Sequence, residues 1–160
     1  MLQYHCKTIR NEGDVCMGKP VETGSNSIKS LMYGLKKKSD CIDLDYVATN
    51  NNFTFALCVF LDTFKRANIE GKYKLIENPP KTKKATQKNL CILAAVVHKL
   101  ANDNNMAVPE WVHAPSYKMP NPIFAHDTTN AEYQSFLISD SPPEFAEKNI
   151  FYGSNAITRV

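Results

Sequence analysis

The stretch NLCILAAVVHKLAN, residues 89–102, decides how this chain folds, because its apolar run is longer than a regular strand usually is. Five of its residues recur at the i, i+3, i+4, i+7 spacing of one helical face. They are Leu90, Leu93, Ala94, Val97 and Ala101. A second face carries Ile92, Val96 and Leu100. We therefore predict a buried helix over residues 87–102 that contacts neighbours on more than one side.

A second amphipathic pattern begins at Phe53. Its apolar stripe consists of Phe53, Ala56, Leu57, Phe60, Leu61 and Phe64. This spacing predicts a helix over residues 53–67 that packs on the first helix, with Phe60, Phe64, Leu93 and Val97 buried. We expect Gly71 to end the helix or to lie just beyond its end, and residues 73–80 to form a packed connection, because Pro79 and Pro80 forbid a regular helix.

Capping signals predict the remaining helices. Thr82 or Thr86 can cap the central helix, and residues 129–132 fit a capping box before a helix that contains Tyr133, Phe136 and Leu137. A second box follows, with Ser141 at the cap, Pro142 at the first helical position and Glu144 at the third. Two short helices are predicted near the termini, over residues 28–35 and 154–160.

The chain as a whole is predicted to be all-α. Residues 1–50 form an irregular N-terminal segment with one short helix, and the polar run over residues 40–52 marks the boundary to a compact helical core domain over residues 51–160. A length of 160 residues needs only one hydrophobic core. We find neither a membrane-length apolar segment nor a signal peptide, and expect a soluble cytoplasmic protein without a membrane partner.

Charge and cysteines limit the possible chemistry. The net charge of +3 is too small to indicate nucleic-acid binding by itself. Lysines concentrate in two places, Lys36, Lys37 and Lys38, then Lys81, Lys83, Lys84 and Lys88. The five cysteines are Cys6, Cys16, Cys41, Cys58 and Cys91. Because they lack the short paired spacing of zinc or redox motifs, we expect free thiols, no metal site and no cofactor.

Prolines and aromatic residues dominate residues 109–124, which therefore cannot form a long helix. A loop of this length in a compact domain is usually anchored on the core or functional. Aromatic side chains supply contact area in protein interfaces, and prolines lower the entropic cost of ordering a segment. The candidate partner-binding residues are Trp111 and Tyr117 in this loop, together with Tyr152.

From about residue 53 to residue 160 the chain resembles a family of small helical bacterial proteins of uncharacterised function. The matching features are Phe60 to Phe64, then Glu77 with Pro79 and Pro80, then Pro109, Glu110 and Trp111, then the run SPPEF at 141–145 with NIF at 149–151, and finally Asn155, Ile157 and Arg159. Members look like companions of nucleotidyltransferase-like toxins, and some carry a helix-turn-helix. The resemblance implies an antitoxin-like protein, but residues 1–50 depart from the helix-turn-helix version.

Three functions remain open from the sequence. The leading hypothesis is a non-enzymatic, antitoxin-like component that neutralises a toxin by direct contact. The second is nucleic-acid binding or regulation, which requires the two lysine clusters to converge. The third is an enzyme in which a cysteine acts with His98 or His113 and an acid such as Asp127.

Overall fold

A computed structural model of the protein describes residues 42–155, apart from the side chain of Thr82. The chain divides into two units, Met1–Lys38 and Ser39–Val160, and the described residues all belong to the second. The predicted helices at 28–35 and 154–160, the lysines at 36–38 and the cysteines at 6, 16 and 41 lie outside the described residues or run beyond them.

The described part is predominantly helical, as predicted. Its α-helices are α2 (Leu44–Thr49), α3 (Phe53–Arg66), α4 (Ile69–Ile76), α5 (Gln87–Asp103), α6 (Ala131–Asp140) and α7 (Pro143–Ala146). Short 3₁₀ helices are η1 (Thr82–Lys84), η2 (Glu110–His113), η3 (Pro115–Tyr117) and η4 (Ala125–Asp127). Two strands that were not predicted, β1 (Ile123–Phe124) and β2 (Ile150–Phe151), pair in parallel.

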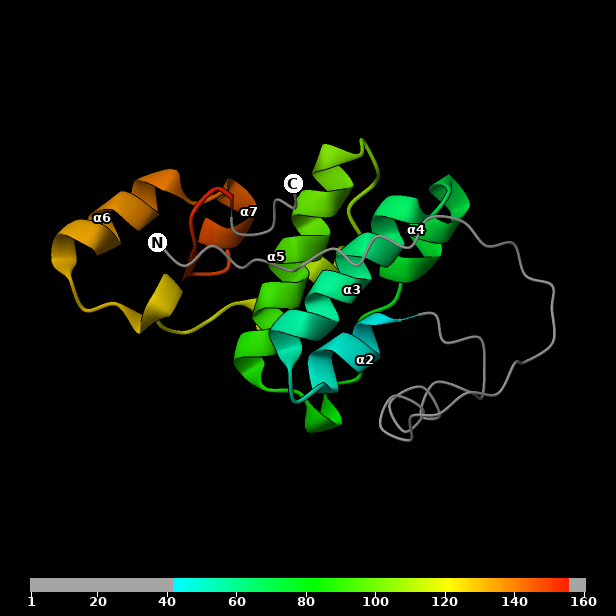
Figure 1. The fold of residues 1–160 in the computed structure, drawn as a ribbon, viewed down its shortest axis with the longest axis horizontal. Coiled ribbons are helices and arrows are strands. Elements are labelled where there is room, and N and C mark those ends of the chain that lie inside the picture. Colours follow the sequence, from blue (N-terminus) through cyan, green and yellow to red (C-terminus); the bar gives the residue numbers. More distant parts are fainter. Residues whose placement is uncertain (1–41, 156–160) are drawn as a thin grey trace, which may run out of the picture. The chain divides into compact units, whose positions relative to one another are not determined.

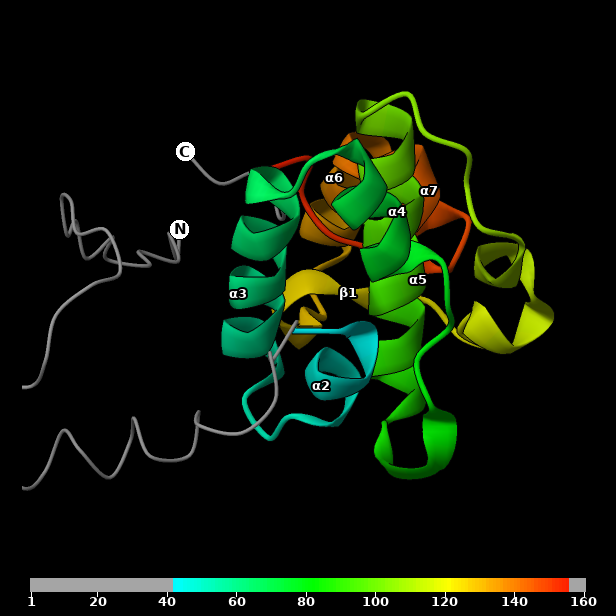
Figure 2. The same ribbon diagram turned by 90° about the vertical axis from the view of Figure 1, so that its right-hand side faces the viewer.

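Helix α5 is the centre of the unit, and both of its predicted faces are buried. The face with Leu90, Leu93, Ala94, Val97 and Ala101 joins a cluster that includes Phe60 and Phe64 of α3. The other side, with Cys91, Ile92, Ala95 and Val96, packs against Phe145 and Ile150. Figures 1 and 2 show α3 and α7 on different sides of α5. The predicted packing of residues 53–67 on residues 87–102 is confirmed.

Helix α2 is a correction to the sequence analysis, which expected polar turns over residues 40–52. Asp43 caps this helix, its carboxylate accepting from the Tyr46 amide at 2.9 Å. Leu44, Val47 and Ala48 enter the same buried cluster as α3 and α5. The packed part of the chain therefore already includes residues 44–49, before the boundary placed at residue 50.

Helix α4 is a second correction, because residues 73–76 were expected in an irregular connection. Helix α3 ends at Arg66, and α4 begins after Asn68, whose side chain accepts from the Gly71 amide at 2.8 Å. A Cβ atom at Gly71 would lie 3.0 Å from that Asn68 oxygen. Gly71 thus lies in the first turn of a helix, where its missing side chain leaves room for the cap.

The predicted caps are partly right. Thr86 caps α5, its hydroxyl accepting from the Asn89 amide. Asn130, rather than Thr129, caps α6. The Ser141 box is wrong: α7 begins at Pro143, and the Ser141 hydroxyl instead donates to the Tyr152 carbonyl oxygen at 2.7 Å. Two successive prolines delay the helix by one residue, because the residue before a proline avoids helical backbone angles.

Candidate functional site

The three aromatic residues predicted to bind a partner are placed differently from one another. Tyr117 is only 6% exposed and packs edge to face on Trp111, with ring centroids 5.0 Å apart. Trp111 is half-buried, and its Nε1 donates to the Ile76 carbonyl oxygen at 3.0 Å. Tyr152 is half-buried beside Phe145. Trp111 and Tyr117 therefore anchor the proline-rich segment to the core, and Tyr117 presents little surface to a partner.

Helix α6 presents apolar side chains that the sequence analysis did not select. Phe136 is 56% exposed, Ile138 53% and Tyr133 39%. The rings of Tyr133 and Phe136 stack on one another, with centroids 6.1 Å apart. Leu137 is the one buried residue of this helix. The low amphipathicity of α6 could have indicated this, because its apolar residues do not fit on a single buried face.

Further exposed apolar residues lie on other helices. They are Tyr46 on α2, Phe55 on α3, and Ile69 and Tyr73 on α4. Figure 1 shows α4 and α6 on opposite sides of α5. Single exposed apolar groups are normal on protein surfaces, whereas the group on α6 combines three of them on ten residues.

The second lysine cluster is partly neutralised. The Lys81 ammonium lies 3.2 Å from Asp45 and that of Lys88 3.4 Å from Asp127. Lys83 and Lys84 are exposed and lie on the rim of an open hollow of about 710 Å³. Tyr46, Pro79, Pro80 and Tyr117 also line it. The predicted convergence of this cluster with Lys36, Lys37 and Lys38 involves residues outside the described range.

The residues named for a cysteine and histidine site do not assemble as predicted. Cys91 is fully buried, and burial raises the pKa of its thiol. Asp127, the suggested acid, is paired with Lys88 on the surface. A thiol that solvent cannot reach and that resists ionisation is a poor nucleophile. Cys91 therefore gives no support to the cysteine version of the enzyme hypothesis.

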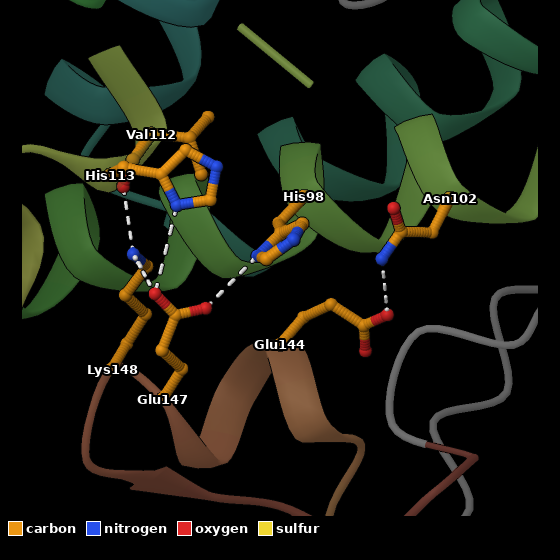
Figure 3. A network of polar contacts seen from close by, with 7 residues as sticks. All are labelled: His98, Asn102, Val112, His113, Glu144, Glu147 and Lys148. Atoms are coloured by element: carbon orange, nitrogen blue, oxygen red, sulfur yellow. Dashed lines mark hydrogen bonds and ion pairs between the residues drawn. The ribbon is translucent and has the colours of Figure 1, made fainter. Parts of the chain in front are cut away.

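The two histidines do meet, with a different acid. His98 of α5 and His113 of η2 lie edge to face, their ring centroids 5.1 Å apart. The Glu147 carboxylate lies between them, with Oε2 3.4 Å from Nδ1 of His98 and Oε1 3.7 Å from Nδ1 of His113 (Figure 3). Glu147 follows α7 directly. One carboxylate therefore faces two elements distant in sequence.

A buried lysine completes this polar network. The Lys148 side chain is only 3% exposed, and its ammonium donates to the Val112 carbonyl oxygen at 2.8 Å and lies 3.4 Å from Glu147. Asn102 of α5 donates to Glu144 at 2.8 Å. Figure 3 shows the two glutamates reaching from α7 towards α5. We call His98, Asn102, His113, Glu144, Glu147 and Lys148 the α7 network.

Two atoms of this network are buried without a hydrogen-bond partner among the described residues. They are Nδ1 of His98 and Oε2 of Glu144. The 3.4 Å between His98 and Glu147 is thus an ion-pair distance without hydrogen-bond alignment. Buried polar atoms left unpaired lower stability, and such sites are often functional.

The network also changes the acidity of its members. Burial lowers the pKa of His98, and the neighbouring Glu147 carboxylate opposes this only in part. Partial burial acts to raise the pKa of Glu147, but the Lys148 ammonium and the two histidines lower it further than burial raises it. At neutral pH His98 is therefore uncharged, whereas Glu147 is ionised beside Lys148.

Within residues 42–155, no three histidine, cysteine or acidic side chains are placed to share a metal ion. None of the helices described there combines the length and the hydrophobicity that a bilayer-spanning segment needs. Comparison with protein-family models, with curated proteins and with solved structures finds no match to this chain. Arguments about its function therefore depend on its own surfaces and on the resemblance described above.

Proposed function

We propose that this protein is a non-enzymatic, antitoxin-like component that binds a partner protein by direct contact. The observation that carries the proposal is the exposed apolar surface of α6 formed by the stacked rings of Tyr133 and Phe136. Aromatic side chains dominate the binding energy of protein interfaces when a partner removes them from water. We call these two residues the α6 surface.

The stacked pair on α6 suits this role. Tyr133 and Phe136 lie one helical turn apart, so their rings form a single block of contact area. Because the rings already contact each other, little side-chain entropy remains to be lost on binding. Tyr152 stays in the proposal as a half-buried neighbour of a partner, because it follows β2, which contacts α6. We leave Tyr117 out because it is almost fully buried, and Trp111 because it is bonded to Ile76 of α4, on the other side of α5 from α6.

The partner that we propose is a nucleotidyltransferase-like toxin, which is what the family resemblance implies. A toxin of this kind is expected from an adjacent reading frame in the same operon. The cheapest observation is therefore the neighbouring gene. An isolated gene, or a metabolic operon, would remove most of the support for the antitoxin role.

The direct test is co-purification of this protein with the product of the adjacent reading frame. We expect Phe136→Ala to weaken binding by tenfold or more, because removing a central interface aromatic costs ~2 kcal/mol. The matched control is Phe55→Ala, because Phe55 has nearly the same exposure, 55% against 56%, and lies on α3. Equal affinities of these two variants for the partner would show that the α6 surface is not the binding site.

Charge reversal separates this function from nucleic-acid binding. Exposed lysines contribute little to a stable protein interface, so Lys83→Glu with Lys84→Glu should leave co-purification intact. A nucleic-acid role predicts the opposite, namely binding that is lost on charge reversal and falls steeply with salt. That outcome would favour nucleic-acid binding over binding of a partner protein as the function.

A further inference from the structure

The α7 network joins three elements through one short segment of the chain. Residues 143–151 contribute Glu144, Glu147 and Lys148, whereas α5 supplies His98 with Asn102, and η2 supplies His113. The same segment covers the second face of α5 with Phe145 and Ile150. Both apolar and ionic contacts therefore hold it in place, and only the ionic contacts depend on pH.

We propose that the Glu147 carboxylate forms an acid-sensitive contact that holds residues 143–151 on α5. It lies between His98 and His113 and beside the buried Lys148 ammonium, and protonation of His98 and of Glu147 releases the segment. The proposal is independent of the partner-binding function. It concerns a conformational change of this chain alone.

The first step on acidification involves His98. Its folded-state pKa lies below the usual 6.5, so below about pH 6.5 the unfolded or released chain takes up a proton more readily than the folded chain. The Glu147 and Glu144 carboxylates favour a charge on His98, whereas His113, 5.1 Å away, and Lys148 repel it. The cost of burying the charge decides the direction of the pKa shift. The contribution of uncharged His98 to stability is therefore fully present above pH 6.5 and is lost as the pH falls towards the folded-state pKa of His98.

The second step involves Glu147 and has the same sign. Its folded-state pKa lies below the usual 4.5, so its contribution is present above pH 4.5 and is lost as the pH falls through the lowered value. Protonation of Glu147 removes the counter-charge of the Lys148 ammonium, which is 3% exposed, and leaves it the hydrogen bond to the Val112 carbonyl. A buried charge without its counter-charge favours release into water.

Release would open identifiable backbone hydrogen bonds. The Met119 amide donates to the Lys148 carbonyl at 3.0 Å, and the Ile123 amide donates to the Asn149 carbonyl at 2.9 Å. Within the segment, the Lys148 amide donates to the Phe145 carbonyl. Loss of these bonds makes the amides exchange with solvent. Helix α4 contributes nothing to the network, and its buried Ile76 belongs to the other apolar cluster, so α4 serves as an internal reference.

The test is hydrogen exchange of the full chain, read by mass spectrometry at pH 7.5 and 5.5, with exchange times corrected for the intrinsic effect of pH. One site that titrates across one pH unit changes an opening equilibrium at most about tenfold. This pH range titrates His98 and leaves Glu147 ionised. We expect residues 143–151 and the amides of Met119 and Ile123 to open about three- to tenfold more at the lower pH, with α4 unchanged. Equal acceleration in both segments, or none in either, would overturn the proposal.

Two histidine variants assign the effect. His98→Gln should remove most of the acceleration in residues 143–151. The matched control is His126→Gln, because His126 is exposed on η4 outside the network and should keep the wild-type response. Wild-type acceleration in His98→Gln would refute the role of His98.

A further variant keeps the test decisive if His98→Gln does not fold. Glu147→Gln removes the charge while keeping the shape, so it should imitate the acidified state. We expect residues 143–151 of this variant to exchange about tenfold faster already at pH 7.5, with α4 unchanged. Protection equal to that of the wild type would show that Glu147 does not hold residues 143–151 on α5.

Discussion

The core assignment is most directly tested by Leu93→Ala. Leu93 is fully buried in the cluster that α5 forms with α2 and α3. The substitution removes three buried side-chain carbons. Each contributes about 0.8 kcal/mol of burial free energy, or about 2.4 kcal/mol together. Because helices pack on both sides of α5, the site cannot collapse fully, and the remaining cavity adds to the loss. We expect the free energy of unfolding to fall by about 3–4 kcal/mol.

Urea unfolding measures this change with two probes, far-ultraviolet circular dichroism and the fluorescence of Trp111. Trp111 is the one tryptophan of the chain, and it packs against the same cluster as Leu93. The two probes should report the same transition. Ile69→Ala is the control, because Ile69 is 60% exposed and should change stability by less than about 0.5 kcal/mol. A loss below about 0.5 kcal/mol for Leu93→Ala would show that the core lies elsewhere.

Three further predictions concern caps and thiols. Asn130→Ala should destabilise the protein by about 1 kcal/mol in urea unfolding, because Asn130 caps α6, whereas Thr129→Ala should have little effect. Ser141→Ala should also cost about 1 kcal/mol, through loss of its hydrogen bond to Tyr152 rather than loss of a helix cap; unchanged stability would mean that water replaces that bond. Five free thiols should be titratable after denaturation without reductant, and metal analysis should find no stoichiometric zinc; one zinc per chain would contradict this.

The strongly periodic helices could be predicted from the sequence because the spacing of their apolar residues determines which face is buried. The faces of α5 were assigned residue by residue, with Leu93 and Val97 in one cluster and Ile92 and Val96 in the other. Such a pattern has a single helical solution that hides every apolar side chain. The Thr86 cap is equally local, since a hydroxyl and an amide three residues later form it.

Short helices were the ones missed or misplaced. Helix α2 has six residues and lies in a polar stretch, and α4 contains a glycine in its first turn. Neither has enough turns for its periodicity to stand out, and isolated helices of this length are unstable in water. Their formation depends on packing, with Val47 and Ile76 fully buried against residues distant in sequence.

The candidate sites divide in the same way. Sequence alone identified the aromatic loop and named His98 and His113 as alternative bases, because residue types and their order are visible there. Only the tertiary structure decided that Tyr117 is buried, that Phe136 is exposed, and that Glu147 rather than Asp127 faces the histidines. The physical reason is that periodicity determines which face of a helix is apolar, whereas the packing of α7 on α5 determines which distant polar groups meet.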